Sequence, residues 1–310
     1  MMSLRTNQAS PIKDPISALV QGKSGGALAL IIRVDGPSYR PLGAMMAIFA
    51  DGTRVGTLSS GCIESDLVLH AKKALKSGES ARLLYGLGSP FIDIQLPCGG
   101  GLEILILPNP DTEILREIDD LRLARQPSTL SIDLVSGEVQ ALSTGQTGLS
   151  GTRFLIRIQP ETSFYVFGKG PEASTFSSLV QASGFPNLLL SPDRETLEFG
   201  AQAGCETRHL TSAKFPSDIL PDPWSAVILF FHDHEWEPPI LKNALATKAF
   251  YIGAQGSQRA RDLRLEALRQ MGATGLERLR GPIGLIPSVR DARMLAVSVL
   301  AEILDTSRRV

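Results

Sequence analysis

Two of the three cysteines stand in glycine-rich segments where a thiol could meet a ligand. Cys62 lies just before a helical pattern, in Ser-Gly-Cys-Ile-Glu, and Cys98 opens a Cys-Gly-Gly segment. Glycine permits positive φ and close approach of the backbone to another group. A cysteine at a helix N-terminus gains thiolate character, and thiolates are ligands for soft metal centres. The alternative is that both are small apolar residues in tight turns, as we expect for Cys205, which has neither setting.

A glycine turn in the second half of the chain indicates a phosphate site. Gly168-x-Gly170-x-x-Ala173 follows the apolar segment 164–167 and precedes a helical pattern. In the dinucleotide-binding pattern the first glycine makes the turn and the second admits a phosphate, while a small third residue lets the helix pack on the strand. The acidic partner for a ribose is poorly matched, because Asp193 comes late. The turn therefore indicates either a phosphate site or an α/β turn without a ligand.

Two histidines, His232 and His234, follow the apolar segment 226–231. Ligands of open α/β sheets bind outside the carboxyl ends of the strands, so these side chains are expected to line a site. Together with neighbouring carboxylates they could hold a divalent metal. No third group of ligands with matching spacing accompanies them in the sequence. We therefore expect site lining, and a metal-dependent hydrolase centred on these histidines is kept as an alternative.

A second glycine turn leads into the helical pattern 257–271. Ser257 is placed to cap this helix, and Arg259 and Arg261 stand in its first turn, where a cation opposes the helix dipole. Between residues 258 and 281, six arginines outnumber three acidic residues. This surplus favours an anion site modestly over arginines that simply face water.

The elements that position these residues change character along the chain. The first part reads as mostly β with one clear helix at 64–75, and Asp-Gly and Ser-Gly pairs predict two hairpins. The polar stretch 143–152 predicts a loop, with a domain boundary at or soon after it. From about residue 160, strands alternate with helices, which predicts a doubly wound, mainly parallel sheet with a strand at 282–285.

We therefore expect an α/β protein with two domains. Residues 1–155 form an N-terminal mixed α+β domain with the two cysteine–glycine loops, and residues 156–310 form a C-terminal Rossmann-like domain. The chain of 310 residues is long enough for two full hydrophobic cores.

Composition restricts the class of protein. The chain is 43% hydrophobic and 20% charged, with a net charge of −1, which gives no support for a nucleic-acid partner. No apolar run is long enough to span a membrane, and the N-terminus lacks the apolar core of a signal peptide. Three cysteines without paired spacing indicate reduced thiols, so we expect a cytoplasmic protein. The large apolar share is consistent with a homodimer.

Taken together, the motifs resemble the xanthine dehydrogenase accessory factor family of the XdhC/CoxI type. The matching segments run in one order over nearly the whole chain: 35–46, Ser60-Gly61-Cys62-Ile63-Glu64, Cys98-Gly99-Gly100, Gly168-Lys169-Gly170, His232-Asp233-His234-Glu235, Tyr251-Ile252-Gly253-Ala254-Gln255-Gly256-Ser257 and Pro282-Ile283-Gly284-Leu285. The chain departs from the family pattern at Ser60, which replaces a glycine, and in the sequence of the Gly168 turn.

The resemblance implies a chaperone for the molybdenum cofactor. Such a protein binds the finished pterin cofactor, protects it, assists its sulfuration and delivers it to a molybdenum hydroxylase apo-enzyme such as xanthine dehydrogenase. A cysteine desulfurase is a further partner that sulfuration implies. We expect an accessory protein rather than a catalyst, and we assign no catalytic residue.

The residues expected to bind the cofactor come from both domains. Cys62 and Cys98 would be soft ligands to molybdenum, and one of the two glycine turns of the C-terminal domain would take the phosphate. The full set is Gly61, Cys62, Glu64, Cys98, Gly99, Gly100, Gly168, Gly170, His232, His234, Gly253, Gly256, Ser257 and Arg259.

The main alternative is an NAD(P)-dependent oxidoreductase that uses the Rossmann turn. It lacks a convincing ribose acid and any His/Asp or Tyr/Lys catalytic spacing. A protein that only mediates interactions, with structural cysteines and no ligand, is a further alternative.

Overall fold

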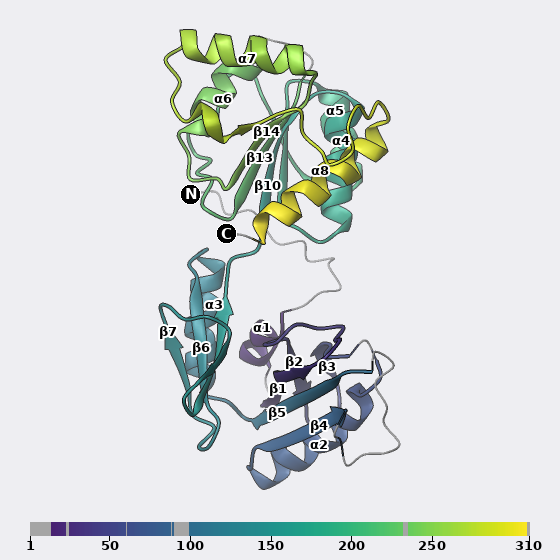
Figure 1. Ribbon diagram of the computed structural model, residues 1–310, viewed down its shortest axis with the longest axis vertical. Helices are drawn as coiled ribbons and strands as arrows, with labels where there is room; N and C mark the ends of the chain where they lie inside the picture. Colours follow the sequence, from purple (N-terminus) through teal and green to yellow (C-terminus); the bar gives the residue numbers. More distant parts are fainter. Residues whose placement is uncertain are drawn as a thin grey trace. The chain divides into compact units, whose positions relative to one another are not determined.

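The computed structural model describes residues 14–22, 25–59, 61–87, 89, 99–231 and 235–308. It contains two compact units, one ending at Pro160 and the other beginning at Glu161 (Figure 1). Each unit has its own hydrophobic cores, so each is described by itself.

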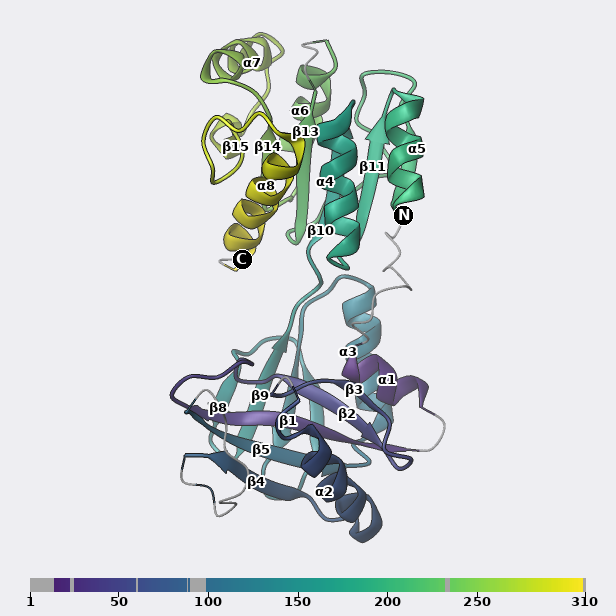
Figure 2. The same ribbon diagram turned by 90° about the vertical axis from the view of Figure 1, so that its right-hand side faces the viewer.

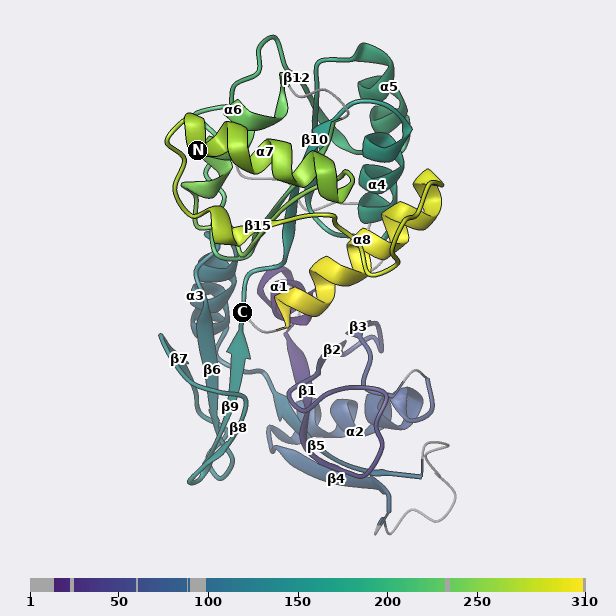
Figure 3. The same cartoon turned by 45° about the horizontal axis from the view of Figure 1, so that its top comes forward.

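The N-terminal unit is built on a five-stranded antiparallel sheet. Its strands are β1 (Gly26–Asp35), β2 (Met45–Phe49), β3 (Arg54–Gly56), β4 (Ala81–Gly86) and β5 (Gly101–Pro108), in the order β3-β2-β1-β5-β4. Helix α2 (Glu64–Ser77) covers one face of this sheet (Figure 3). It buries Leu67 and Ala71 against strand residues such as Ile31 and Ile104, and it ends at Gly78, which has the left-handed φ of +75°. The hydrophobic stripe of α2 thus forms the core on this face.

A second antiparallel sheet and two helices cover the other face. The sheet contains β6 (Ser128–Asp133), β7 (Val139–Leu142), β8 (Gly148–Ser150) and β9 (Arg153–Ile158), in the order β7-β6-β9-β8. Helices α1 (Pro15–Gln21) and α3 (Thr112–Leu123) complete the layer. Leu115 and Ile118 of α3 share one core with Leu28 of β1 and Leu130 of β6.

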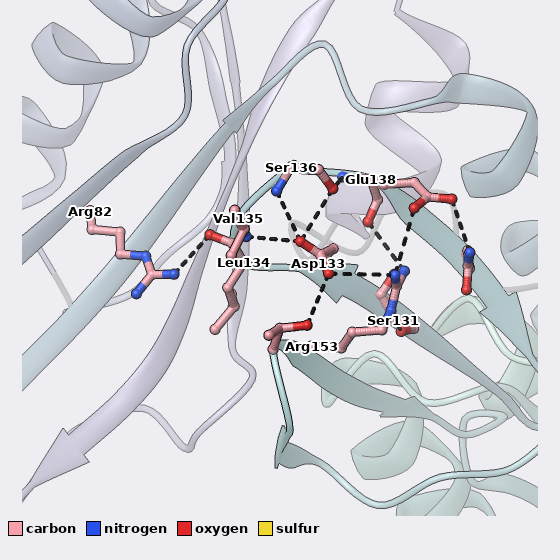
Figure 4. A network of polar contacts seen from close by, with 10 residues as sticks. Arg82, Ser131, Asp133, Leu134, Val135, Ser136, Glu138 and Arg153 are labelled. Carbon is pink, nitrogen blue, oxygen red and sulfur yellow. Dashed lines mark hydrogen bonds and ion pairs between the residues drawn. The ribbon is translucent and has the colours of Figure 1, made fainter.

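A polar network fixes the turn between β6 and β7 (Figure 4). One carboxylate oxygen of Asp133 accepts hydrogen bonds from the amides of Val135 and Ser136, both at 2.9 Å, and these bonds hold the pKa of Asp133 at about 2. Arg82 of β4 donates to the carbonyl of Leu134 at 2.8 Å. The turn is therefore tied to the edge of the five-stranded sheet.

The C-terminal unit is a Rossmann-like domain with a six-stranded parallel sheet. Its strands are β10 (Ser163–Gly168), β11 (Asn187–Ser191), β12 (Glu206–His209), β13 (Ser225–Phe230), β14 (Tyr251–Ala254) and β15 (Leu279–Arg280). Their order is β12-β11-β10-β13-β14-β15, so the strand order reverses between β10 and β13, where open α/β sheets bind ligands. The predicted fold class is confirmed.

Helices cover both faces of this sheet. Figures 1 and 2 show α4 (Pro171–Ala182), α5 (Arg194–Gln202) and α8 (Ala292–Ser307) on one face, and α6 (Glu237–Leu245) and α7 (Gln258–Gln270) on the other. Phe176 of α4 and Val299 of α8 belong to the first core, and Ile240 of α6 and Leu268 of α7 belong to the second. No helix within the described residues has the length and apolarity to cross a bilayer.

Three expectations about the elements were wrong. The stretch 143–152 contains β8, and α1 and α3 accompany the one helix predicted for the N-terminal part. Residues 282–285 form no strand in the structure. Pro282 has no amide hydrogen, and Gly284 has a φ of +104°. The amides of Gly284 and Ile286 instead donate to Glu302 and Ser298 of α8, so this segment is a turn held by that helix.

Candidate functional site

The loop that carries Cys62 is built around the carboxylate of Glu64. This side chain is the first residue of α2 and is only 2% exposed. Its Oε1 accepts hydrogen bonds from the Thr57 hydroxyl at 2.5 Å and the amides of Leu58 and Ser59 at 3.1 and 2.9 Å. Its Oε2 accepts from the Ser59 hydroxyl at 2.6 Å and the amides of Gly61 and Ile63 at 2.9 and 3.2 Å.

These bonds determine the charge of Glu64. Burial alone would raise its pKa, but the hydrogen bonds from Ser59 and Thr57 outweigh burial and lower the pKa from 4.5 to about 2. Glu64 is therefore a buried carboxylate anion at neutral pH. It faces its own loop rather than solvent, and cofactor contact by Glu64 stays a prediction.

Cys62 lies at the exposed tip of this loop. The preceding Gly61 has a φ of +112°, a conformation that residues with a Cβ rarely adopt, and the following Ile63 is fully buried. Cys62 is a free, exposed thiol, whereas Cys205 is buried and its pKa is raised to about 11 by burial. The structure thus separates the two cysteines in the way that the sequence indicates.

The second cysteine–glycine segment is only partly described, because Cys98 lies outside the described residues. Gly99 has a φ of +72°. Gly100 packs against the backbone of the β1–β2 connection, where a Cβ on Gly100 would collide with the carbonyl of Pro37 and approach that of Asp35 to 2.9 Å. Gly100 is therefore required by close backbone packing within the protein.

Both segments belong to the same end of the five-stranded sheet. Gly101, the first residue of β5, pairs with Asp35 at the end of β1 and with Gly86 at the end of β4. Next to Gly86, the Tyr85 hydroxyl donates to Asp66 at 2.5 Å, and Asp66 is in the first turn of α2. The structure thus brings the N-terminus of α2 and the Gly99–Gly100 segment to the same end of this sheet.

The glycine turn after β10 is closed by side chains of the protein. A Cβ on Gly168 would lie 2.7 Å from the Phe230 carbonyl and 2.9 Å from the Cβ of Ala173, so both small residues serve packing. Gly170 has a φ of +88°, and its amide donates to the Thr196 hydroxyl at 2.8 Å. That hydroxyl donates to Asp193 at 2.5 Å.

Two groups that would contact a dinucleotide are already hydrogen-bonded within the protein. The Gly170 amide already has an acceptor, and Asp193 caps α5, accepting from the Thr196 amide at 2.9 Å. The hydrogen bonds from Thr196 lower the pKa of Asp193. Glu172 adds an acidic side chain to the first turn of α4, where a phosphate would bind. The sequence did contain a signal for this cap. Asp193 is an acidic residue that precedes a helical pattern, and Thr196, whose amide it accepts, follows three residues later.

His232 and His234 lie outside the described residues, but the residues on either side of them are well defined. Phe231 stacks on Trp236, with ring centroids 6.0 Å apart. Glu237, the first residue of α6, forms a buried ion pair with Arg264 of α7, with two hydrogen bonds of 3.0 Å. Arg264 also donates to the Gln255 carbonyl at 2.6 Å. Apart from the surplus of arginines, nothing in the sequence pattern indicated the ion pair between Glu237 and Arg264.

The second glycine turn is also partly engaged in packing. A Cβ on Gly253 would lie 2.8 Å from Ile283, and Gly256 has a φ of +139°. Ser257 caps α7 as predicted, accepting from the Ala260 amide at 3.2 Å. Arg259 is exposed in the first turn.

Most of the arginine surplus is engaged within the protein. Arg278 donates to the carbonyls of Leu245, Thr247 and Ala249. Arg280 lies over the Tyr251 ring at 5.3 Å and 3.8 Å from Glu302. With Arg264 paired to Glu237, the surplus is weaker support for an anion site than the sequence indicated. Among the described residues, no group of three or more His, Cys, Asp or Glu side chains could hold a metal ion.

Models of known protein families match both units of the chain. The family model "XdhC and CoxI family" matches residues 19–86, and the model "XdhC Rossmann domain" matches residues 164–303. The chain is 34% identical over 295 residues to the molybdenum cofactor insertion chaperone PaoD of Escherichia coli K12, covering 94% of this chain and 86% of that protein.

Two more distant proteins are similar over almost their full length. A protein of Bacillus subtilis 168, described as a probable subunit of xanthine dehydrogenase, is 23% identical, with 95% of this chain and 97% of that protein covered. The crystal structure of a protein described as a xanthine dehydrogenase from Bacillus halodurans has a TM-score of 0.77 and 23% identity, with 95% of each chain covered. The last comparison supports the fold. With two family models and a relative at 34% identity, the chain belongs to the XdhC and CoxI family.

Proposed function

We propose that this protein is a chaperone that binds the molybdenum cofactor and inserts it into a molybdenum hydroxylase apo-enzyme such as xanthine dehydrogenase. One observation carries the proposal: the similarity to a molybdenum cofactor insertion chaperone extends over 94% of the chain. A function shared over both units is better supported than one assigned from a single motif.

The geometry of the N-terminal unit supports the proposal. A ligand with a soft molybdenum–sulfur centre can be bound by a thiolate and by a backbone that approaches it closely. Cys62 is an exposed thiol next to a glycine with positive φ, in the loop before α2, whose first turn lies at the same end of the sheet as Gly99–Gly100. Cys62 and Cys98 are the proposed ligands to molybdenum. Gly253, Gly256, Ser257, Arg259 and the two histidines are separate candidates for cofactor contact in the C-terminal unit.

The NAD(P)-dependent oxidoreductase is the weaker candidate. The strand order of the C-terminal sheet favours an oxidoreductase. However, the Gly170 amide donates to the Thr196 hydroxyl, and Asp193 is the N-cap of α5. A dinucleotide would have to displace the Thr196 hydroxyl to use that amide.

The proposal also covers a second partner, the cellular compartment and the oligomeric state. Protection and sulfuration of the cofactor would bring a cysteine desulfurase as a second partner, and reduced thiols agree with a cytoplasmic protein. A homodimer is supported by the exposed apolar side chains Leu285, Ile286, Met294 and Val297 on and beside α8. Light scattering of the full chain tests the dimer, and co-purification tests the desulfurase.

Binding of the molybdenum cofactor is the direct test of the function. Purified protein is mixed with cofactor released from a donor enzyme, separated by gel filtration and assayed for pterin fluorescence and molybdenum. Stoichiometric co-elution is expected. Binding of NADH without co-elution of the cofactor would favour the oxidoreductase, and binding of neither would favour an interaction protein.

A further inference from the structure

The site around Glu64 is an anion site that the chain fills with its own side chain. Six donors converge on one carboxylate, three on each oxygen, from four amides and two hydroxyls. A carboxylate only accepts hydrogen bonds, so all six donors are matched. A glutamine there would turn an NH₂ group toward three donors, so the site selects a carboxylate over its neutral isostere.

The donors lie on both sides of the thiol in the sequence. The Gly61 amide at 2.9 Å and the Ile63 amide at 3.2 Å donate to the same oxygen, Oε2, and Cys62 is the residue between them. The Ile63 amide is shared with the Ser59 hydroxyl oxygen at 3.1 Å, and that hydroxyl itself donates to Oε2. One carboxylate oxygen therefore holds the amides of the residues before and after Cys62. The thiol itself stays exposed, because the backbone and not the cysteine side chain makes these bonds.

We infer that Glu64 is the positioning residue for Cys62: its buried carboxylate holds the amides on either side of the thiol and so presents it to the molybdenum centre. This inference rests on the proposed function and deepens it, because it gives Glu64 a role through the loop in place of direct contact with the cofactor. Residues that orient a metal ligand change metal affinity about 10-fold to 100-fold when they are replaced.

Rescue by a small carboxylate tests the inference. Glu64→Ala leaves a space lined by the six donors, which formate can fill. We expect the variant to bind the cofactor about 10-fold or more weakly and to lose hydrogen-exchange protection at the Gly61 amide, and to a smaller extent at the Ile63 amide, which keeps the Ser59 hydroxyl as an acceptor. Added formate restores both, whereas sodium chloride at the same concentration does not. Glu79→Ala, which removes an exposed carboxylate beyond the end of α2, is the matched control and changes neither.

A second variant covers the case in which Glu64→Ala fails to fold. Glu64→Gln fills the same volume, so it is expected to weaken cofactor binding and to resist rescue by formate. Wild-type cofactor affinity in Glu64→Gln, or full protection of the Gly61 amide in Glu64→Ala without formate, would overturn the inference. If the wild-type protein itself binds no cofactor, the proposed function fails, and the exchange measurement still decides whether Glu64 holds the loop.

Discussion

The two glycine turns at the starts of α2 and α4 differ in the groups that accept hydrogen bonds from their backbone amides. Each leaves backbone amides before a helix without helical partners. Before α2, the Glu64 carboxylate gathers four amides and two hydroxyls, and an exposed thiol remains at the tip. Before α4, the Thr196 hydroxyl from the next helix takes the Gly170 amide, and the exposed residue is Lys169.

A glycine turn before a helix therefore does not by itself indicate a ligand. What matters is which group occupies the amides and which side chain is left outside. Gly168 is required for space, because Phe230 and Ala173 pack against it. Gly61 is required for its φ of +112°, and among the described residues other than its chain neighbours a Cβ on Gly61 would have no atom within 4 Å. Substitutions can therefore distinguish the two turns.

The largest effect is expected from Gly168→Ala. The new methyl group would meet the Phe230 carbonyl at 2.7 Å and the Phe230 Cβ at 2.8 Å, and neither atom can move without shifting β13. Overpacking of this kind should lower the free energy of unfolding by about 3 kcal/mol. Chemical denaturation measures it. An unchanged midpoint would show that the turn after β10 is looser than the structure describes.

Acid should weaken the N-terminal unit through Glu64. Its pKa is about 2 in the folded protein and 4.5 as the ordinary value, so its stabilisation is present above the unfolded pKa and is lost as pH falls from about 4.5 toward 2. We expect a loss of about 2 kcal/mol, since water beside the exposed loop screens part of the effect. Denaturation of wild type at a series of acidic pH values measures it. A Glu64→Gln protein should lack this component, and a pH profile identical to that of wild type would contradict the role of the carboxylate.

Thr196→Val should destabilise the C-terminal turn by a smaller amount. The substitution keeps the shape but removes the acceptor for the Gly170 amide and the donor to Asp193. Loss of these bonds should lower the free energy of unfolding by about 1.5 kcal/mol. Thr196→Ser retains the hydroxyl and serves as the control. Equal stability of the two variants would mean that the hydroxyl does not close the turn.

Gly61→Ala is expected to have the smallest effect on stability. In the part of the chain that the structure describes, no heavy atom beyond the chain neighbours crowds the new methyl group, so the positive φ is what opposes it, at a cost of about 1 kcal/mol. The reactivity of Cys62 toward a thiol reagent should change more than stability does, because the two residues are adjacent. A loss as large as that of Gly168→Ala would remove the distinction between the two turns.

Local patterns predicted the elements that local chemistry determines. The helix predicted at 64–75, the cap by Ser257 and the packing of Ala173 on Gly168 all follow from residue types at short spacing. The alternation of strands and helices also predicted the parallel sheet, because each helix returns the chain to the same end of the sheet before the next strand begins.

The sequence could not show which side chains accept hydrogen bonds from the backbone of their own turns. The contact of Glu64 with the cofactor stays a prediction, and the sequence did not show that its carboxylate accepts hydrogen bonds from six donors between Thr57 and Ile63. Asp193 was considered as a partner for a ribose, and it caps α5. The turn at 282–285 depends on Glu302 and Ser298, which are contacts between distant residues.

Molybdenum cofactor binding should be compared first in four proteins: wild type, Cys62→Ser, Lys169→Ala and Cys205→Ser. We predict that Cys62→Ser binds the cofactor about 10-fold or more weakly, because it loses a soft ligand, whereas the buried Cys205 and the exposed Lys169 can be replaced without loss. Wild-type binding by Cys62→Ser, with a loss in Lys169→Ala, would contradict this assignment and place the ligand at the C-terminal turn.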